Sequence, residues 1–152
     1  MFLKSNYQKS NAITQVKFSI SDLAKETADK ILKSKSVESR QSLGEILLDE
    51  LSDGAGIDIV KLKISDTRQY HKKYRGVTVF KQYGYYRPAS NYIYIQNLTS
   101  VFGRPLATKT FLDSLLHEWL HHYDHHKLKL DSIHTKGFYL RLKSLKARLE
   151  IL

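Results

Sequence analysis

The chain contains no cysteine in its 152 residues. It therefore cannot form disulfide bonds, build a thiolate zinc finger or use a cysteine nucleophile. The lack of disulfides favours an intracellular location. It also limits the side chains that can hold a metal ion to histidine, aspartate and glutamate.

Long apolar runs are lacking as well. Within the first 18 residues, Lys4, Lys9 and Lys17 interrupt the apolar side chains, unlike the apolar core of a signal peptide. No run approaches the ~20 apolar residues of a membrane-spanning helix. We therefore expect a protein that is neither secreted nor membrane-bound, located in the cytoplasm, the nucleus or the nucleoid.

The length and composition suit one domain. With 41% hydrophobic and 26% charged residues the chain is ordinary for a globular protein and needs no metal clip merely to fold. No repeat or low-complexity tract divides it. We expect a single domain over residues 1–152, in which residues 1–18 form a loosely ordered lead-in.

The net charge of the chain is +10, and no acidic residue lies between Asp66 and Asp113. The same stretch holds eight basic residues and seven of the ten tyrosines. Cations that contact phosphates and rings that stack on bases are what a single-stranded nucleic-acid surface needs, although tyrosine also suits a half-buried strand. The stretch therefore predicts DNA as a partner. The candidate contacts are Arg68, Lys72, Lys73, Arg75, Lys81 and Arg87.

The spacing of apolar residues predicts four helices. Two of them cover about 21–34 and 37–52, each with serines available as caps. A third begins near Thr108 or Thr110, either of which can serve as its cap, and the last covers about 134–150. Because apolar residues wrap more than one side of the third helix, we expect other elements to cover it on two sides.

β-Branched and aromatic residues predict strands over 57–64, 77–80 and 91–95. We expect these strands to form a small three-stranded antiparallel sheet, with Gly84 and Pro88 in a connection. Together with the helices, this sheet predicts an α+β fold.

The third predicted helix carries the pattern HExxH, from His117 to His121. A helix turns about 100° per residue, so these two histidines lie on one face about one turn apart. Both imidazoles can then reach one metal ion at ~2.0–2.1 Å. Glu118 beside them can accept a proton from water that the metal activates. The pattern predicts two metal ligands and a general base.

A zinc hydrolase usually has three protein ligands, so a third one is needed. His125 lies eight residues after His117, about 12 Å along a helix, which is too far for one metal ion. A ligand from another segment is therefore required. His134, at the start of the last helix, is the first candidate, and Asp131 and Glu150 are its rivals.

The segment HEWLH, followed after twelve residues by HTKGF, resembles the SprT-like (Spartan-type) zinc metallopeptidases. The resemblance implies a zincin-like domain of the minimal gluzincin type with one zinc ion, bound by His117, His121 and His134, and Glu118 as general base. It also implies protein or peptide substrates, including proteins bound or crosslinked to DNA. Family members often have glycine where this chain has Thr135. The cysteine zinc ribbon of some members cannot form here.

Two other functions fit the residues. One is a basic nucleic-acid-binding module whose metal site is structural or inactive. The other is a zinc hydrolase that cleaves a bond other than a peptide bond, because HExxH specifies activated water more strongly than the group it attacks. For a peptidase, we expect the substrate to add to the sheet edge near 91–96. The donor that stabilises the oxyanion is expected in the tyrosine- and arginine-rich sheet region.

The remaining aromatic residues of this segment have structural interpretations. We expect His122, His125 and His126 on the solvent side or at the end of their helix, where a charged imidazole suits the helix dipole. Trp119 and Phe138 are expected in the core rather than in contact with substrate.

Overall fold

The computed structural model describes residues 4–68, 72–74, 77–80, 83–99 and 102–151, and describes no side chain from residue 67 to residue 82. Its elements confirm the α+β class. In chain order they are α1 (Asn6–Ala12), α2 (Asp22–Ile31), α3 (Val37–Ala55), β1 (Lys61–Arg68), β2 (Lys72–Tyr74), β3 (Val77–Phe80), β4 (Gly84–Arg87), the 3-10 helix η1 (Pro88–Ser90), β5 (Tyr92–Leu98), α4 (Thr108–His126) and α5 (Lys136–Arg148).

The main sheet has three strands in the order β1-β5-β4. Strand β5 runs parallel to β1, with Ile95 opposite Ile64, and antiparallel to β4, with Ile93 opposite Tyr86. The predicted all-antiparallel sheet is therefore wrong. Parallel neighbours require a long crossover, and the intervening residues 69–91 supply one.

The membership of the sheet also differs from the prediction. Strand β3, at 77–80, pairs with β2 in a separate antiparallel ribbon. The third strand of the main sheet is β4, which lies between Gly84 and Pro88 in the predicted connection. Glycine and proline are typical of turns, so Gly84 and Pro88 predict a connection. The strand β4 has only four residues, too few to outweigh this signal.

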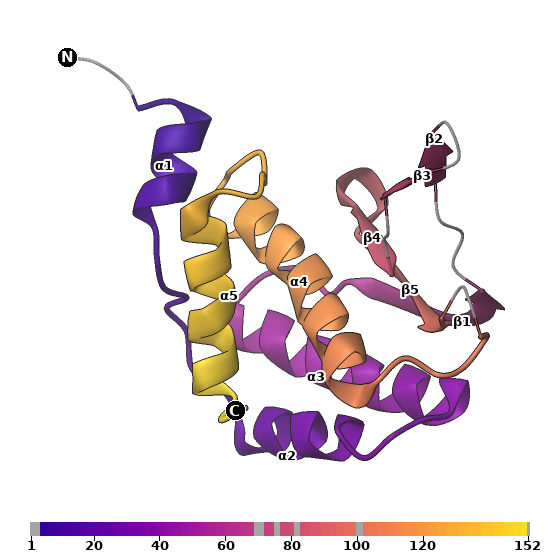
Figure 1. Ribbon diagram of the computed structural model, residues 1–152. Helices are drawn as coiled ribbons and strands as arrows, with labels where there is room; N and C mark the ends of the chain where they lie inside the picture. The colour runs from indigo at the N-terminus through magenta and orange to yellow at the C-terminus, as the bar shows by residue number, and fades with distance from the viewer. Residues whose placement is uncertain (1–3, 69–71, 75–76, 81–82, 100–101, 152) are drawn as a thin grey trace.

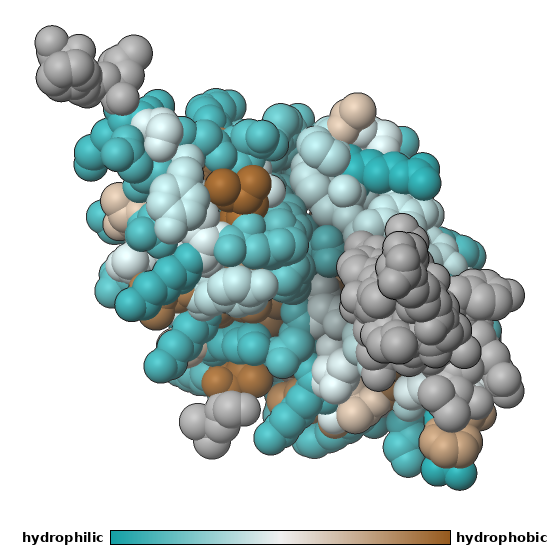
Figure 2. All heavy atoms as spheres, turned by 45° about the horizontal axis from the view of Figure 1, so that its top comes forward, coloured by the Kyte–Doolittle hydropathy of each residue, from teal (hydrophilic) through white to brown (hydrophobic). Residues whose placement is uncertain are grey.

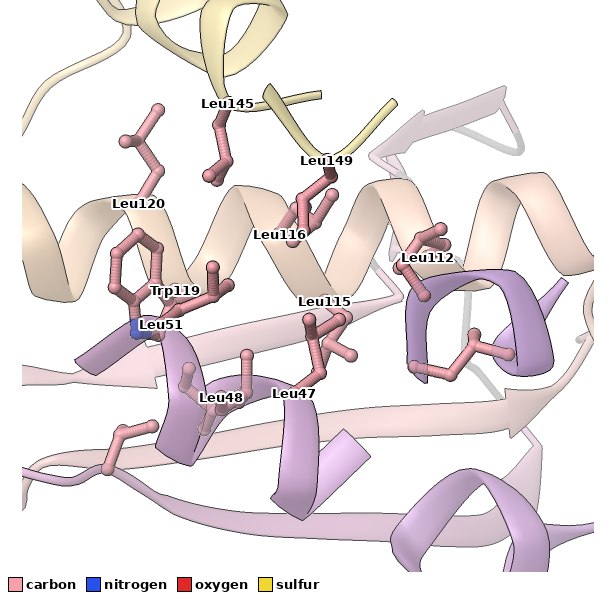
Figure 3. Packing of buried hydrophobic residues seen from close by; sticks show 14 of the residues in the cluster. Leu47, Leu48, Leu51, Leu112, Leu115, Leu116, Trp119, Leu120, Leu145 and Leu149 are labelled. Atoms are coloured by element: carbon pink, nitrogen blue, oxygen red, sulfur yellow. The ribbon is translucent and has the colours of Figure 1, made fainter. Parts of the chain in front are cut away.

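Helix α4 is the centre of the fold. Figure 1 shows it running between α5 on one side and α3 with the sheet on the other. Figure 3 shows leucine side chains of α3 and of the C-terminal residues 145 and 149 packed against those of α4. This arrangement confirms that α4 is covered on two sides, and the fully buried Trp119 and Phe138 confirm their predicted place in the core. The labelled residues are Leu47, Leu48, Leu51, Leu112, Leu115, Leu116, Trp119, Leu120, Leu145 and Leu149.

The ends of the early helices follow ordinary capping rules. The Ser21 side chain caps α2 by accepting a hydrogen bond from the backbone of Ala24. Ser36 caps α3, and Gly56 ends it in the left-handed conformation that glycine adopts without strain. Helix α4 begins after Ala107 without a side-chain cap, contrary to the threonine caps considered above.

The last helix begins later than predicted. Thr135 is its N-cap, and the Thr135 hydroxyl accepts a hydrogen bond from the Phe138 backbone at 3.0 Å. His134 therefore lies in the loop before α5, and the prediction that the C-terminal helix carries the third ligand is wrong. The Thr135 hydroxyl makes this side-chain cap possible, which glycine at the same position could not provide.

The expected lead-in contains a helix, α1. It begins with a capping box in which the Ser5 side chain accepts from the Gln8 backbone and the Gln8 side chain accepts from the Ser5 backbone. Figure 1 shows α1 beside the first turns of α5, where the two helices are in contact. The N-terminal segment is thus placed next to the loop that carries His134.

The surface in Figure 2 is mostly hydrophilic, with hydrophobic side chains in small separate patches. In the part of the chain that the structure describes, no helix has both the length and the apolar character needed to cross a bilayer.

Candidate metal centre

Three histidines converge on one point. His117 and His121 come from successive turns of α4, and His134 comes from the loop before α5. The Nε2 atom of His134 lies 3.0 Å from Nε2 of His117 and 3.1 Å from Nε2 of His121. Nitrogen ligands of a tetrahedral zinc ion, at ~2.0–2.1 Å from the metal, are about 3.4 Å apart. The three side chains are therefore close to the spacing that one metal ion requires, and they could bind one.

The protonation state of the two histidines of α4 favours metal binding. Burial, together with the charges of neighbouring histidines, lowers the pKa of His117 to about 4 and that of His121 to about 3. Both imidazoles are therefore neutral near pH 7. Neutral imidazole is the form that binds metal ions.

Hydrogen bonds behind His121 leave its Nε2 free for a metal. The Ser132 hydroxyl donates to Asp124 at 2.8 Å, so it accepts the proton of His121 Nδ1 at 2.7 Å. This leaves the lone pair on Nε2, which faces the other ligands. Arg141 in turn donates two hydrogen bonds to Asp124, at 2.7 and 3.0 Å. Asp124 lies one turn after His121, so helical spacing could have indicated it, but nothing in the sequence singles out Ser132.

Phe138 packs directly against the ligands. Its ring stacks on His121 with centroids 4.6 Å apart and meets His117 edge-on at 5.0 Å. Because Phe138 is fully buried, it excludes water from one side of both imidazoles and limits their rotation. The core position predicted for Phe138 therefore also supports the site.

Glu118 lines the cavity in front of the histidines. Burial raises the pKa of its carboxyl group to about 7. A group with a pKa near the working pH is well suited to accept and return a proton. The cavity has a volume of about 460 Å³. Its lining residues are Tyr85, Tyr86, Pro88, His117, Glu118, His121, His125, Asp131, Ser132 and His134.

The prediction that His122 lies on the solvent side or at the end of its helix is wrong, because its side chain is fully buried. Its Nε2 donates to the carbonyl oxygen of Asp58 at 2.6 Å, so its Nδ1 accepts from the Tyr86 hydroxyl at 2.8 Å. The first bond joins α4 to the segment before β1, and the second joins α4 to β4 beside the cavity. His125 is exposed as expected, and His126 is half-buried with its Nε2 2.7 Å from Asn91 Oδ1.

The rival metal ligands are not part of the converging group. Asp131 and His125 line the same cavity, but the group within ligand distance consists of His117, His121 and His134. Glu150 forms an exposed ion pair with Lys25 at 3.5 Å. Helix α5 starts after His134 and ends before Glu150, which separates these two residues by the length of the helix.

The predicted nucleic-acid contacts are only partly described. Arg87 is exposed at the end of β4, and its guanidinium lies 4.8 Å from the centre of the Tyr85 ring. The backbone of Arg68 belongs to β1, and that of Lys72 and Lys73 to β2, while their side chains lie outside the described part. Arg75 and Lys81 lie outside the described residues altogether.

Comparison with known proteins gives no direct guide to function. The sequence matches no protein-family model, no curated protein and no solved structure. The function therefore has to be inferred from the site.

Proposed function

We propose that the protein is a zinc-dependent metallopeptidase with a zincin-like fold of the SprT-like type. The observation that carries this proposal is the convergence of His117, His121 and His134 in the cavity that Glu118 also lines. Three nitrogen ligands with an open fourth position are typical of catalytic zinc, whereas structural zinc is usually enclosed by four protein ligands. The exposed position of His134 and the open cavity fit the catalytic type.

Zinc at this site would supply Lewis acidity and lower the pKa of water toward ~7. Glu118 would accept the proton of the attacking water and return it to the leaving amine. Ser132 and Phe138 would hold the ring of His121 in place. The Tyr86 hydroxyl donates to His122, so we assign Tyr86 to the cavity wall rather than to stabilisation of the oxyanion.

The sheet edge at which the substrate is expected to bind needs a correction. Strand β5 is central in the sheet, so the predicted edge at 91–96 is not an edge. The edge nearest the site is β4, whose residues Tyr85 and Tyr86 line the cavity with the histidines. We propose that an extended protein or peptide substrate adds to β4 by main-chain hydrogen bonds. Proteins associated with DNA are the substrate class that the SprT-like resemblance implies.

Metal analysis tests the proposed ligands. We expect the purified protein to retain about one zinc ion per chain and the variant His134→Ala to retain almost none, because two ligands hold zinc far more weakly than three. The measurement is the zinc-to-protein ratio after dialysis. His125→Ala is the matched control, since His125 lies in the same cavity outside the ligand group and should keep its zinc. Equal zinc in wild type and His134→Ala would contradict the assignment.

A second candidate function, nucleic-acid binding, is favoured by the outer face of the sheet. Along β5 the residues Ile93 and Ile95 are buried under the helices, so the alternating Tyr92 and Tyr94 face the other side. Tyr85 of β4 stacks on Tyr94 with ring centroids 5.2 Å apart. The flanking cations are Lys61 and Lys63 of β1, opposite Tyr92 and Tyr94, and Arg87 of β4. Rings flanked by cations suit single-stranded nucleic acid.

A binding assay with labelled single-stranded DNA tests this surface. We expect wild type to bind at low salt and Tyr94→Ala to bind with a free energy weaker by about 1–3 kcal/mol, because one stacking ring is lost. Raising the salt should weaken binding steeply. Tyr7→Ala, which removes an exposed tyrosine of α1, is the control. Absence of binding at low salt, or equal affinity of the two variants, would exclude this function.

A further inference from the structure

Helix α1 holds the part of the loop that precedes His134 in the chain. The Asn6 side chain pairs with the backbone of Asp131 in both directions. Its Nδ2 donates to the Asp131 carbonyl oxygen at 2.7 Å, and its Oδ1 accepts from the Asp131 amide at 2.9 Å. A side-chain amide that satisfies both backbone groups of one residue fixes the position of that residue.

Helix α1 also holds the chain on the side after His134. The buried hydroxyls of Ser10 and Thr135 are 2.9 Å apart, and Asn11 Oδ1 accepts from the Gly137 amide at 3.2 Å. Gly137 leaves no room for a side chain, because an added Cβ would lie 2.2 Å from the Ser10 carbonyl oxygen. The two chain segments that flank the third ligand are therefore both attached to α1.

A further connection leads from α1 to a second ligand. Arg141 donates to the carbonyl oxygens of Ser10 and Ile13, both at 2.6 Å, while it also pairs with Asp124. Asp124 accepts from Ser132, the residue that holds His121. The end of α1 therefore helps to place the buried arginine behind the metal centre.

We propose that α1 is a positioning element of the metal centre, and that docking of α1 and metal binding by the three histidines depend on each other. This inference rests on the metal site proposed above. His134 is exposed and lies on a loop, where a ligand is placed less precisely than on a helix unless neighbouring groups support it. Helix α1 has 7 residues, too few to be stable alone in water, so its structure depends on docking.

Substitutions in α1 test the coupling through zinc affinity. Asn6→Ala combined with Asn11→Ala removes the contacts to Asp131 and Gly137 without lowering helix propensity. We expect zinc to bind about 10–100-fold more weakly, the usual effect of losing groups that orient ligands. Affinity is measured by competition with a chromophoric chelator. Tyr7→Ala combined with Lys9→Ala, on exposed positions of the same helix, is the matched control and should bind zinc like wild type.

Three further single variants, Gly137→Ala, Asn11→Asp and Asn11→Ala, sharpen the result. Gly137→Ala should weaken zinc binding as well, because the added methyl group forces Ser10 and α1 away from α5. Asn11→Asp keeps an acceptor oxygen for the Gly137 amide at the start of α5, where negative charge is favourable, and should retain the affinity that Asn11→Ala loses. Wild-type affinity in the double alanine variant would overturn the proposal, as would equal affinities of Asn11→Asp and Asn11→Ala.

Hydrogen exchange of the unmodified protein tests the reverse direction. Coupling is reciprocal, so saturating zinc should slow amide exchange in residues 6–12 by about the factor by which α1 strengthens zinc binding, roughly 10–100-fold. Exchange in α1 that ignores zinc would overturn the proposal. These outcomes can be distinguished from failure of the proposed function. A wild type that binds no zinc refutes the metal site itself. Zinc affinity that does not change with the substitutions in α1 refutes only the coupling.

Discussion

The variant Glu118→Gln is expected to hydrolyse fluorescently labelled casein at least about 10²-fold, and up to about 10⁴-fold, more slowly than the wild type, while its zinc content stays unchanged. Glutamine has the size of glutamate but cannot accept the proton of the attacking water. Burial raises the pKa of the Glu118 carboxyl group, so an uncharged amide at this position should not destabilise the fold. The measurements are the hydrolysis rate, the zinc-to-protein ratio and the melting temperature.

The control for this experiment is Glu38→Gln. It makes the same change of charge at an exposed position in the first turn of α3 and should hydrolyse casein like the wild type. Equal rates for Glu118→Gln and the wild type would contradict the role of Glu118 as general base. A wild type that binds zinc but cleaves neither casein nor itself would favour the nucleic-acid-binding alternative with an inactive metal site.

The variant Arg141→Met is expected to lower the free energy of unfolding by about 3–5 kcal/mol, the largest stability effect that we anticipate. Arg141 and Asp124 are both fully buried and lie 2.7 Å apart. Without the guanidinium, the Asp124 carboxylate and the carbonyl oxygens of Ser10 and Ile13 lose buried partners. Stability is measured by urea denaturation with a chelator present, so that zinc binding does not contribute to the result.

The neighbouring substitution Lys143→Met serves as control, because Lys143 is exposed on the same helix. A loss below about 1 kcal/mol in Arg141→Met, as for an exposed ion pair, would contradict the prediction. The double variant Asp124→Asn with Arg141→Met should be more stable than the sum of the two single losses indicates, since it leaves no unpaired charge in the core.

The parts of the site that are local in sequence could be predicted from it. Helical geometry alone places His117 and His121 on one face of α4 with Glu118 beside them, and it removes His125 from the ligand group. The third ligand depends on how the chain turns between two helices. Its position in the sequence makes His134 the first candidate, and the structure brings it to the other two histidines, although from a loop instead of a helix.

The parts that depend on distant pairing could not be predicted. Strand β5 pairs with β1 in parallel through a long crossover, and no local pattern encodes that choice. The ion pair of Asp124 and Arg141 joins two helices and resembles ordinary surface charges in the sequence. Helix α1 is different, because the serine and glutamine of its capping box are a local signal, but a helix of 7 residues has only about two turns and shows little periodicity.

The contacts between α1 and the segment around His134 also determine when the site can form. Asn6 and Asp131 are 125 residues apart in sequence, and Ser10 and Arg141 are 131 apart. Contacts of such separation close very large loops and tend to form late in folding. Until α1 docks, His134 lacks these supports, so the chain would offer two ligands placed by α4 and a third whose position is not fixed. If the three histidines bind a metal ion as proposed, tight binding would be expected only after these contacts have formed.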